Sequence, residues 1–114
     1  MRSAHWQEGP GKEVDVDLLV FIERYASDLL KWDLISFFVQ NPDLYDTADN
    51  VARYIGRNPR VVRSELGDLA LLGVLERDSL NGSPVFYLTR RPELRELALR
   101  FARHLNSSGQ QMTP

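Results

Sequence analysis

Apolar side chains recur at helical spacing within residues 47–75, and the first run of them predicts a short helix. This run consists of Val51, Ala52, Tyr54 and Ile55. Thr47 suits the N-cap, because its hydroxyl can accept a hydrogen bond from an unpaired amide of the first turn. Gly56 suits the C-terminal end, because glycine enters the left-handed C-cap conformation without steric cost. The segment between Thr47 and Gly56 is therefore predicted to be helical.

A second helical pattern follows after a short turn. Asn58 can cap this helix, and Pro59 suits its first position, where no amide hydrogen is needed. An apolar stripe at i, i+4 and i+7 then follows, formed by Val62, Leu66 and Leu69. Gly73 ends the pattern and an extended segment begins. Two short helices joined by a tight turn are the arrangement of a helix-turn-helix.

The chain before this pair predicts helices as well. Over residues 15–30, apolar residues repeat at spacings of three and four: Leu18, Phe21, Ile22, Tyr25 and Leu29. Ser27-Asp28 either caps a new helix or lies within a longer one, and the pattern allows both. Residues 34–39 are apolar nearly all round and end at Asn41-Pro42, so we expect this segment at the centre of the core. Leu44-Tyr45 can add one brief strand.

The chain after the helix pair predicts a hairpin. Two extended segments, residues 75–78 and 85–89, flank Asn81-Gly82. Asn81 and Gly82 tolerate positive φ, which a type I′ turn requires. Alternation predicts two side chains facing the core, those of Phe86 and Leu88, and three facing outward, those of Val85, Tyr87 and Thr89.

The two ends of the chain set the domain limits. Pro92 opens a last helix with one apolar face, formed by Leu94, Leu97, Ala98, Phe101 and Leu105. A length of 114 residues suits one domain and leaves little room for a second. Both termini are polar and lack periodicity. We therefore expect a disordered arm over residues 1–13, a domain over 14–105 and a disordered tail over 106–114.

The composition excludes several classes of chemistry. The chain has no cysteine, so disulfides, thiol catalysis and cysteine-ligated zinc are excluded. Its two histidines, His5 and His104, lie far apart, and no Ser/His/Asp set or paired carboxylates stand out. We therefore expect no enzyme activity, no metal and no cofactor. No apolar run approaches the roughly 18 residues that span a bilayer, and the N-terminus lacks the apolar region of a secretory signal. These features fit a cytoplasmic protein without a membrane partner.

The net charge of −2 argues at first against a nucleic-acid partner, but its distribution is uneven. Residues 1–46 carry 4 Lys/Arg against 9 Asp/Glu, a net charge of −5. Residues 47–91 carry 7 against 5, a net charge of +2, and residues 92–114 carry +1. A positive middle on an acidic body permits DNA binding on one face, although the field is modest.

A helix, a helix-turn-helix and a two-stranded hairpin together resemble the winged helix-turn-helix superfamily of DNA-binding transcription regulators. The closest pattern is that of the small bacterial repressors of the multiple-antibiotic-resistance and arsenic-repressor types. Their run v-x-x-x-L-x-x-L-x-x-x-G-L-[IV] is matched by Val62, Leu66, Leu69, Gly73, Val74 and Leu75. Ala52 matches the small residue where the two helices cross, and the wing motif [YF]-x-L-T is matched by Phe86, Leu88 and Thr89. The resemblance covers residues 31–91. It implies a mostly α fold with a small β-hairpin: a three-helix core, a two-stranded wing and extra N- and C-terminal helices.

The same resemblance implies a sequence-specific regulator of transcription that binds double-stranded DNA as a homodimer. The helix of residues 59–72 would enter the major groove. The helix pair would contact DNA through Arg53, Arg57, Asn58, Arg60, Arg63 and Ser64. The wing region would add Arg77, Asn81, Arg90 and Arg91. The four arginines from 53 to 63 have no interleaved acid, which favours a binding surface over an ordinary solvated face.

Other features qualify this interpretation. Glu65 and Asp68 would repel phosphate if they faced the groove, and the wing tip, residues 80–84, is uncharged, so we expect a weak contribution from the wing. The dimer interface would use helix 15–30, helix 92–105 or both, although helix 15–30 also fits as an extra helix packed on its own monomer. The alternative function is a winged-helix module that binds protein instead of DNA, with the acidic N-terminal helix as the partner surface.

Overall fold

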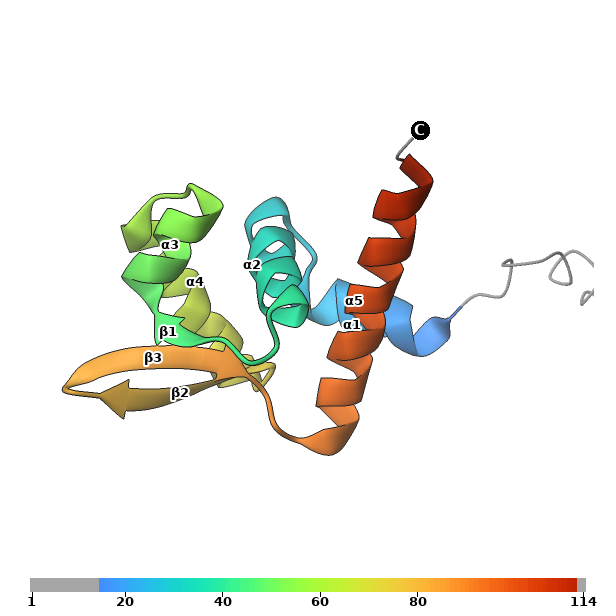
Figure 1. Ribbon diagram of the computed structural model, residues 1–114. Coiled ribbons are helices and arrows are strands. Elements are labelled where there is room, and N and C mark those ends of the chain that lie inside the picture. The colour runs from blue at the N-terminus through green and yellow to red at the C-terminus, as the bar shows by residue number, and fades with distance from the viewer. Residues whose placement is uncertain (1–14, 113–114) are drawn as a thin grey trace, which may run out of the picture.

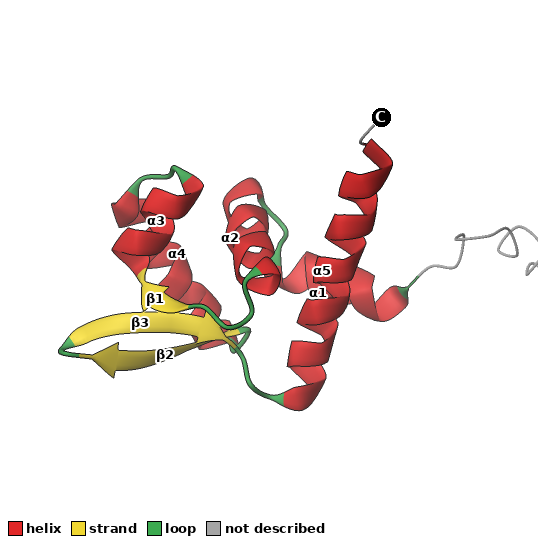
Figure 2. Cartoon of the chain, in the orientation of Figure 1, coloured by secondary structure: helices red, strands yellow, loops and turns green. Residues whose placement is uncertain are grey.

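The computed structural model describes the backbone of residues 15–112 and the side chains of residues 15–107 (Figures 1 and 2). In this part of the chain the elements are α1 (Val16–Tyr25), α2 (Leu29–Gln40), β1 (Tyr45–Thr47), α3 (Ala48–Ile55), α4 (Pro59–Leu72), β2 (Leu75–Leu80), β3 (Ser83–Leu88) and α5 (Pro92–Met112). The predicted arm of residues 1–13 lies outside the described residues.

The predicted N-terminal helix of residues 15–30 is two helices. The side chain of Asp28 accepts a hydrogen bond from the Lys31 amide at 2.8 Å and caps α2. Ala26 leaves the helical conformation with φ −133° and closes α1. Ser27-Asp28 therefore starts a new helix. The break turns α1 away from α2, so that α1 packs mainly against α5.

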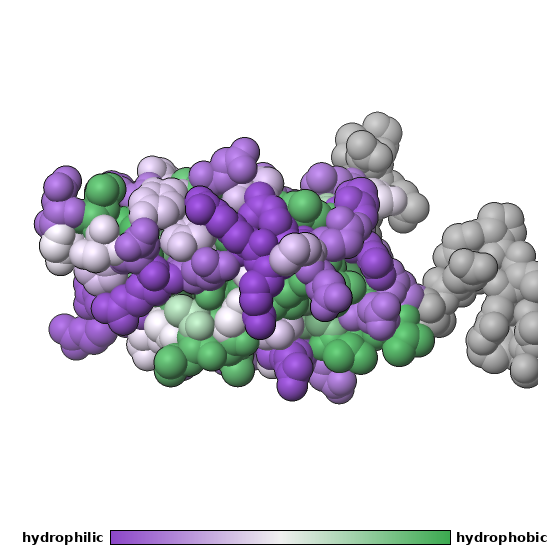
Figure 3. All heavy atoms as spheres, turned by 90° about the horizontal axis from the view of Figure 1, so that it is seen from below, coloured by the Kyte–Doolittle hydropathy of each residue, from purple (hydrophilic) through white to green (hydrophobic). Residues whose placement is uncertain are grey.

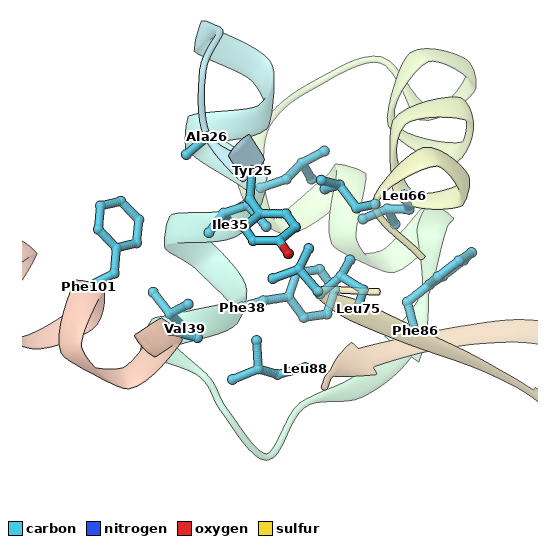
Figure 4. Packing of buried hydrophobic residues seen from close by; sticks show 14 of the residues in the cluster. Tyr25, Ala26, Ile35, Phe38, Val39, Leu66, Leu75, Phe86, Leu88 and Phe101 are labelled. Carbon is cyan, nitrogen blue, oxygen red and sulfur yellow. The ribbon is translucent and has the colours of Figure 1, made fainter. Parts of the chain in front are cut away.

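The apolar run of residues 34–39 lies at the centre of the core, as predicted. It belongs to α2, which contacts each of the other four helices that the structure describes. Leu34, Ile35 and Phe38 are fully buried. Figure 4 shows Phe38, Leu75 and Leu88 pointing toward one another, so α2 joins the helix pair and the sheet through one interior.

The helix-turn-helix has the predicted caps. Thr47 Oγ1 accepts a hydrogen bond from the Asn50 amide at 3.3 Å, and Asn58 Oδ1 accepts one from the Arg60 amide at 2.8 Å. Gly56 and Gly73 end α3 and α4 with φ of 70° and 94°. This is the left-handed region that a side chain adopts only at a cost. The sequence prediction for this segment is confirmed.

The hairpin of β2 and β3 gains a third strand, and the sheet has the antiparallel order β1-β3-β2. The predicted brief strand near Tyr45 is β1, where Tyr45 pairs with Tyr87. With this addition, the architecture is the expected winged helix-turn-helix with flanking helices. The hairpin extends away from α5 (Figure 1).

Two side chains that were expected to face outward from the hairpin are buried, so that prediction is wrong for Val85 and Thr89. Val85 lies on the central strand, with β1 paired on one side and β2 on the other. The hydroxyl of Thr89 donates to Glu76 at 3.2 Å and accepts from the Arg91 amide at 3.1 Å. Hydrogen bonding to both sides makes the burial of this polar group inexpensive.

The last helix, α5, continues to Met112, beyond Leu105, where its end was predicted. Phe101 is fully buried and lies 5.7 Å from the Phe21 ring of α1 and 5.0 Å from the Trp32 ring of α2. Arg100 also contacts Asp15 at the start of α1, with donor–acceptor distances of 3.2 and 3.1 Å. α5 therefore holds α1 on the body of the domain.

Carboxylates that cap helices and loops make the fold sensitive to acid. A hydrogen bond from the Leu18 amide lowers the pKa of Asp15, one from the Lys31 amide lowers the pKa of Asp28, and one from the Arg90 amide lowers the pKa of Glu76. Since their pKa values are lower in the folded chain, these groups stabilise it above their unfolded pKa values of about 4. This stabilisation disappears as the pH falls through the folded pKa values.

We therefore expect the urea concentration at the midpoint of unfolding to decrease as the pH is lowered from about 6 to about 3. Circular dichroism during urea titration at several pH values measures this. Asp15→Asn removes one contributor and should flatten the profile. A wild-type midpoint that stays constant over this range would contradict the prediction.

Candidate nucleic-acid interface

The candidate contact residues of the helix pair lie together on α3, the turn and the first half of α4. The buried stripe of α4, which contains Val62 and Leu66, faces the core. Arg60, Arg63 and Ser64 are exposed on the other side of the same helix. The core thus orients α4 so that its N-terminal half presents its polar side chains outward.

Arg63 forms an ion pair with Asp49 across the two helices. Its Nη2 lies 2.8 Å from Asp49 Oδ1, and both side chains are more than half exposed. The pair borders a hollow of about 160 Å³ that is also lined by Ser83 and Pro84 of β3. The start of α3, the front of α4 and the wing therefore meet at this point.

Two other arginines of the cluster also have partners. Arg57, in the turn, forms an ion pair with Asp33 of α2. Arg53 donates a hydrogen bond to Asn50, and the Asn50 amide group donates in turn to Asp46 at 2.7 Å. The arginine run is free of acids along the sequence but not in space. Its electrostatic field is weaker than the sequence alone predicted.

Arg60 makes no ion pair within the part of the chain that the structure describes. It is exposed in the first turn of α4, and the next residue, Val61, is half exposed. Arginine can bind guanine, and an apolar side chain can contact the thymine methyl group in the major groove. Val61 was not among the contact residues predicted from the sequence. Val61 directly precedes Val62 of the buried stripe, and this position already indicated that its side chain points away from the core.

Asn58 has a structural role that limits its use in binding. Its Oδ1 accepts from the Arg60 amide and, at 3.4 Å, from the Val61 amide. The amide nitrogen of the side chain remains a donor for an external acceptor. Asn58 therefore shapes the N-terminus of α4 and can offer one donor.

Glu65 does not face outward from α4. Its side chain is 15% exposed, and its Oε2 lies 2.9 Å from the Nζ of Lys31 on α2. Hydrogen bonds to Glu65 and, to a smaller extent, to Asp28 raise the pKa of Lys31, so the Lys31 ammonium stays charged at neutral pH. The predicted repulsion between Glu65 and phosphate therefore does not apply, whereas Asp68 is exposed.

The wing offers few cations. Arg77 lies on β2 opposite Phe86, and Asn81 occupies the turn with φ 53°. Both are exposed, while the tip itself, residues 80–84, carries no charge. Tyr45 stacks on Tyr87 at 5.0 Å and donates a hydrogen bond to Asp78 at 2.7 Å, so the sheet here is occupied by its own contacts.

Arg90 and Arg91 lie at the other end of the sheet. They follow the open end of the hairpin, where Leu75 pairs with Leu88. Arg90 packs over the Tyr87 ring, with its Cζ 4.8 Å from the ring centroid. The side chain of Arg91 lies beside Gly73 at the C-terminus of α4, where its Nη2 is 2.9 Å from the point that a Cβ on Gly73 would occupy. A helix of 14 residues is about 20 Å long. These two arginines are thus one helix length from the front of α4.

A hollow lies between α1 and α5. Its volume is about 640 Å³, and its apolar lining includes Val20, Phe21, Leu94 and Leu97. Residues 15–112 contain no group of His, Cys, Asp and Glu side chains placed to hold a metal ion. Within the same range, no helix combines the length and the apolar character needed to cross a bilayer.

Comparison with known proteins yields a similarity in structure but none in sequence. No protein-family model matches the chain, and no significant match occurs among curated protein sequences. The fold is similar to that of a solved structure described as "Possible transcriptional regulator from Methanosarcina mazei Go1". The TM-score is 0.54 and the sequence identity 15%, over 85% of this chain and 89% of the other. At this identity, the likeness shows a shared fold and nothing finer.

Proposed function

We propose that the protein is a DNA-binding regulator of transcription that inserts the front of α4 into the major groove. The observation that carries this proposal is the outward face of α4. Arg60, Arg63 and Ser64 are exposed there beside Val61, on a helix capped by Asn58. The description of the similar structure as a possible transcriptional regulator supports the same role.

The proposed contacts divide into two kinds. Arg60, Val61 and Ser64 lie on the outward face of α4 and would read base edges. Arg53, Arg57 and Arg63 lie along the α3 side and would bind phosphates, which fix the position of the helix in the groove. Arg77 and Asn81 would contact the backbone weakly, because the wing tip is uncharged. Arg90 and Arg91 lie too far from the front of α4 to share its groove, and we assign them no contact with the same site.

The test is fluorescence anisotropy with a labelled random duplex at two salt concentrations. We expect binding that weakens as salt rises, because each neutralised phosphate releases counterions. With three or so phosphate contacts, the affinity should fall roughly 10- to 50-fold between 50 and 200 mM salt. Absence of salt-sensitive binding, even at the lower concentration, would overturn the proposal.

We also propose that the protein forms a two-fold homodimer through the outer face of α1. α1 buries Leu18, Phe21 and Tyr25 against its own domain, yet it also exposes apolar residues at i, i+3 and i+4. These are Val16, Leu19 and Val20, with exposed fractions of 63%, 54% and 53%. On the face shown in Figure 3, hydrophobic surface lies at the end of the molecule that α1 and α5 form, and a second patch lies nearer the middle. A helix that is apolar on both faces favours a second contact.

Charge on α1 suits an antiparallel pairing of two copies. Asp17 and Arg24 are seven residues apart on one ridge of the helix, and both line the hollow beside α5. Their midpoint falls at Val20-Phe21. About a two-fold axis at this midpoint, Asp17 of each copy would lie opposite Arg24 of the other. A two-fold dimer of this kind has two α4 helices, and palindromic sites require two recognition helices.

The variant Leu19→Glu/Val20→Glu should raise the dissociation constant of the dimer about 100-fold or more, because burying unpaired carboxylates is costly. Sedimentation equilibrium measures this. Leu71→Glu/Leu72→Glu is the matched control, since both leucines are exposed on α4, away from the proposed interface. A wild-type protein that remains monomeric at about 100 μM, or a control that dissociates equally, would contradict the dimer.

A protein-binding module is the second candidate function. The ion pairs of Arg57 and Arg63 favour it, because they reduce the charge available to DNA. In that case the apolar outer face of α1 would contact a different protein. The anisotropy experiment separates the two functions, because only the first predicts salt-sensitive binding of duplex DNA.

A further inference from the structure

We propose that Asp49 and Asp33 act as internal counter-ions that limit binding to the DNA backbone. The inference rests on the DNA-binding function proposed above. Each carboxylate forms an ion pair with an arginine that would otherwise be free to bind phosphate: Asp49 with Arg63 and Asp33 with Arg57. A phosphate has to displace a carboxylate at each of these two positions.

The placement of the two pairs carries the inference. Both join different elements: Asp49 lies on α3 and Arg63 on α4, while Asp33 lies on α2 and Arg57 in the turn. Both involve arginines beside the front of α4. Arg60, which lies between them in sequence, makes no ion pair with any described residue and is exposed in the first turn. The counter-ions therefore pair with two of the three arginines assigned to phosphates, Arg57 and Arg63, and leave Arg60, assigned to the bases, without a carboxylate partner among the described residues.

The Arg63–Asp49 pair is weak enough to be displaced. Arg63 and Asp49 have side-chain exposures of 57% and 67%, so solvent screens their attraction. A duplex offers phosphates at the same spacing whatever its sequence. Competition from the carboxylates thus reduces backbone binding equally on all sequences. Contacts of Arg60 and Val61 with bases carry no such competitor. The consequence is a weaker backbone contribution on every sequence, so base contacts supply a larger share of the binding free energy at the preferred site.

Removal of one counter-ion tests this directly. Asp49→Asn keeps the shape of the side chain and removes its charge. Asp43→Asn is the matched control, because Asp43 is fully exposed in the connector after α2, with Arg95, 3.8 Å away, as its neighbour. Both variants change the net charge by the same amount. Binding of a random duplex is measured for both by anisotropy over a range of salt concentrations.

We expect Asp49→Asn to bind random duplex about five-fold more tightly than Asp43→Asn, with a salt slope steeper by about one. Asp33→Asn, which releases Arg57, should act in the same direction and provides an independent variant. When Arg63 is already replaced by alanine, Asp49→Asn should increase the affinity for random duplex no more than Asp43→Asn does. Circular dichroism melting confirms that each variant is folded.

The outcomes separate the two proposals. If wild type binds duplex DNA and both Asp49→Asn and Asp33→Asn match the control, the counter-ion inference is overturned and the proposed function stands. A gain that persists without Arg63 also overturns the role of the Asp49 pair. If neither wild type nor any variant shows salt-sensitive binding, the proposed function fails, and the counter-ion inference fails with it.

Discussion

The double variant Arg60→Ala/Arg63→Ala is expected to lose about 100-fold or more in affinity for the preferred DNA site while remaining folded. Each arginine contact is worth about 1–3 kcal/mol, so two contacts sum to about 2–6 kcal/mol, and 100-fold corresponds to about 2.7 kcal/mol. Anisotropy with a duplex obtained by selection of bound fragments measures the affinity.

Arg103→Ala is the control for this variant. Arg103 is exposed on α5 and pairs with Glu96 at 3.1 Å, so its loss removes a positive charge remote from α4. We expect a change of less than about two-fold, because a charge outside the interface acts only through the screened field. An unchanged affinity of the double variant would show that α4 is not the recognition helix.

The variant Phe101→Ala should destabilise the fold by about 3–5 kcal/mol. Phe101 is fully buried, and its ring contacts Phe21 of α1 and Trp32 of α2. Truncation removes the transfer free energy of the ring and leaves a cavity between three helices. The loss is a large share of the 5–15 kcal/mol that small domains have in total. Denaturant unfolding followed by circular dichroism measures the change.

Leu71→Ala is the matched control for this variant, because Leu71 is 87% exposed on α4. We expect a change within about 0.5 kcal/mol. Phe101→Ala should also release α1 and thereby weaken the proposed dimer. If Phe101→Ala were no more destabilising than the control, α5 would not be part of the cooperative core.

Much of the helix-turn-helix could be predicted from the sequence because its signals are local. Thr47, Gly56 and Gly73 mark helix ends through their own backbone and side-chain chemistry, and the structure confirms all three. The stripe of Val62, Leu66 and Leu69 likewise shows which side of α4 is buried. Local chemistry and periodicity act within one element, so the residues of that element suffice.

Boundaries that depend on neighbours were harder to predict. The break at Ser27-Asp28 was left open, because a polar residue inside a helix and one at its cap look alike in sequence. The burial of Thr89 depends on Glu76, 13 residues away, and therefore did not follow from alternation along β3. The pairing of β1 with β3 also could not be predicted from local pattern, because it joins segments far apart in the chain.

The sequence by itself determined the two helices of the helix-turn-helix and their caps, the hairpin and the outward direction of Arg60, Arg63 and Ser64. Only the tertiary structure decided what those arginines face. The run from Arg53 to Arg63 has no interleaved acid, yet Asp49 and Asp33 reach it from α3 and α2. Glu65, two residues after Arg63, points toward Lys31 of α2 and is largely buried. Charges interact through space and not along the chain, so the field of the α4 face depends on the packing of three helices.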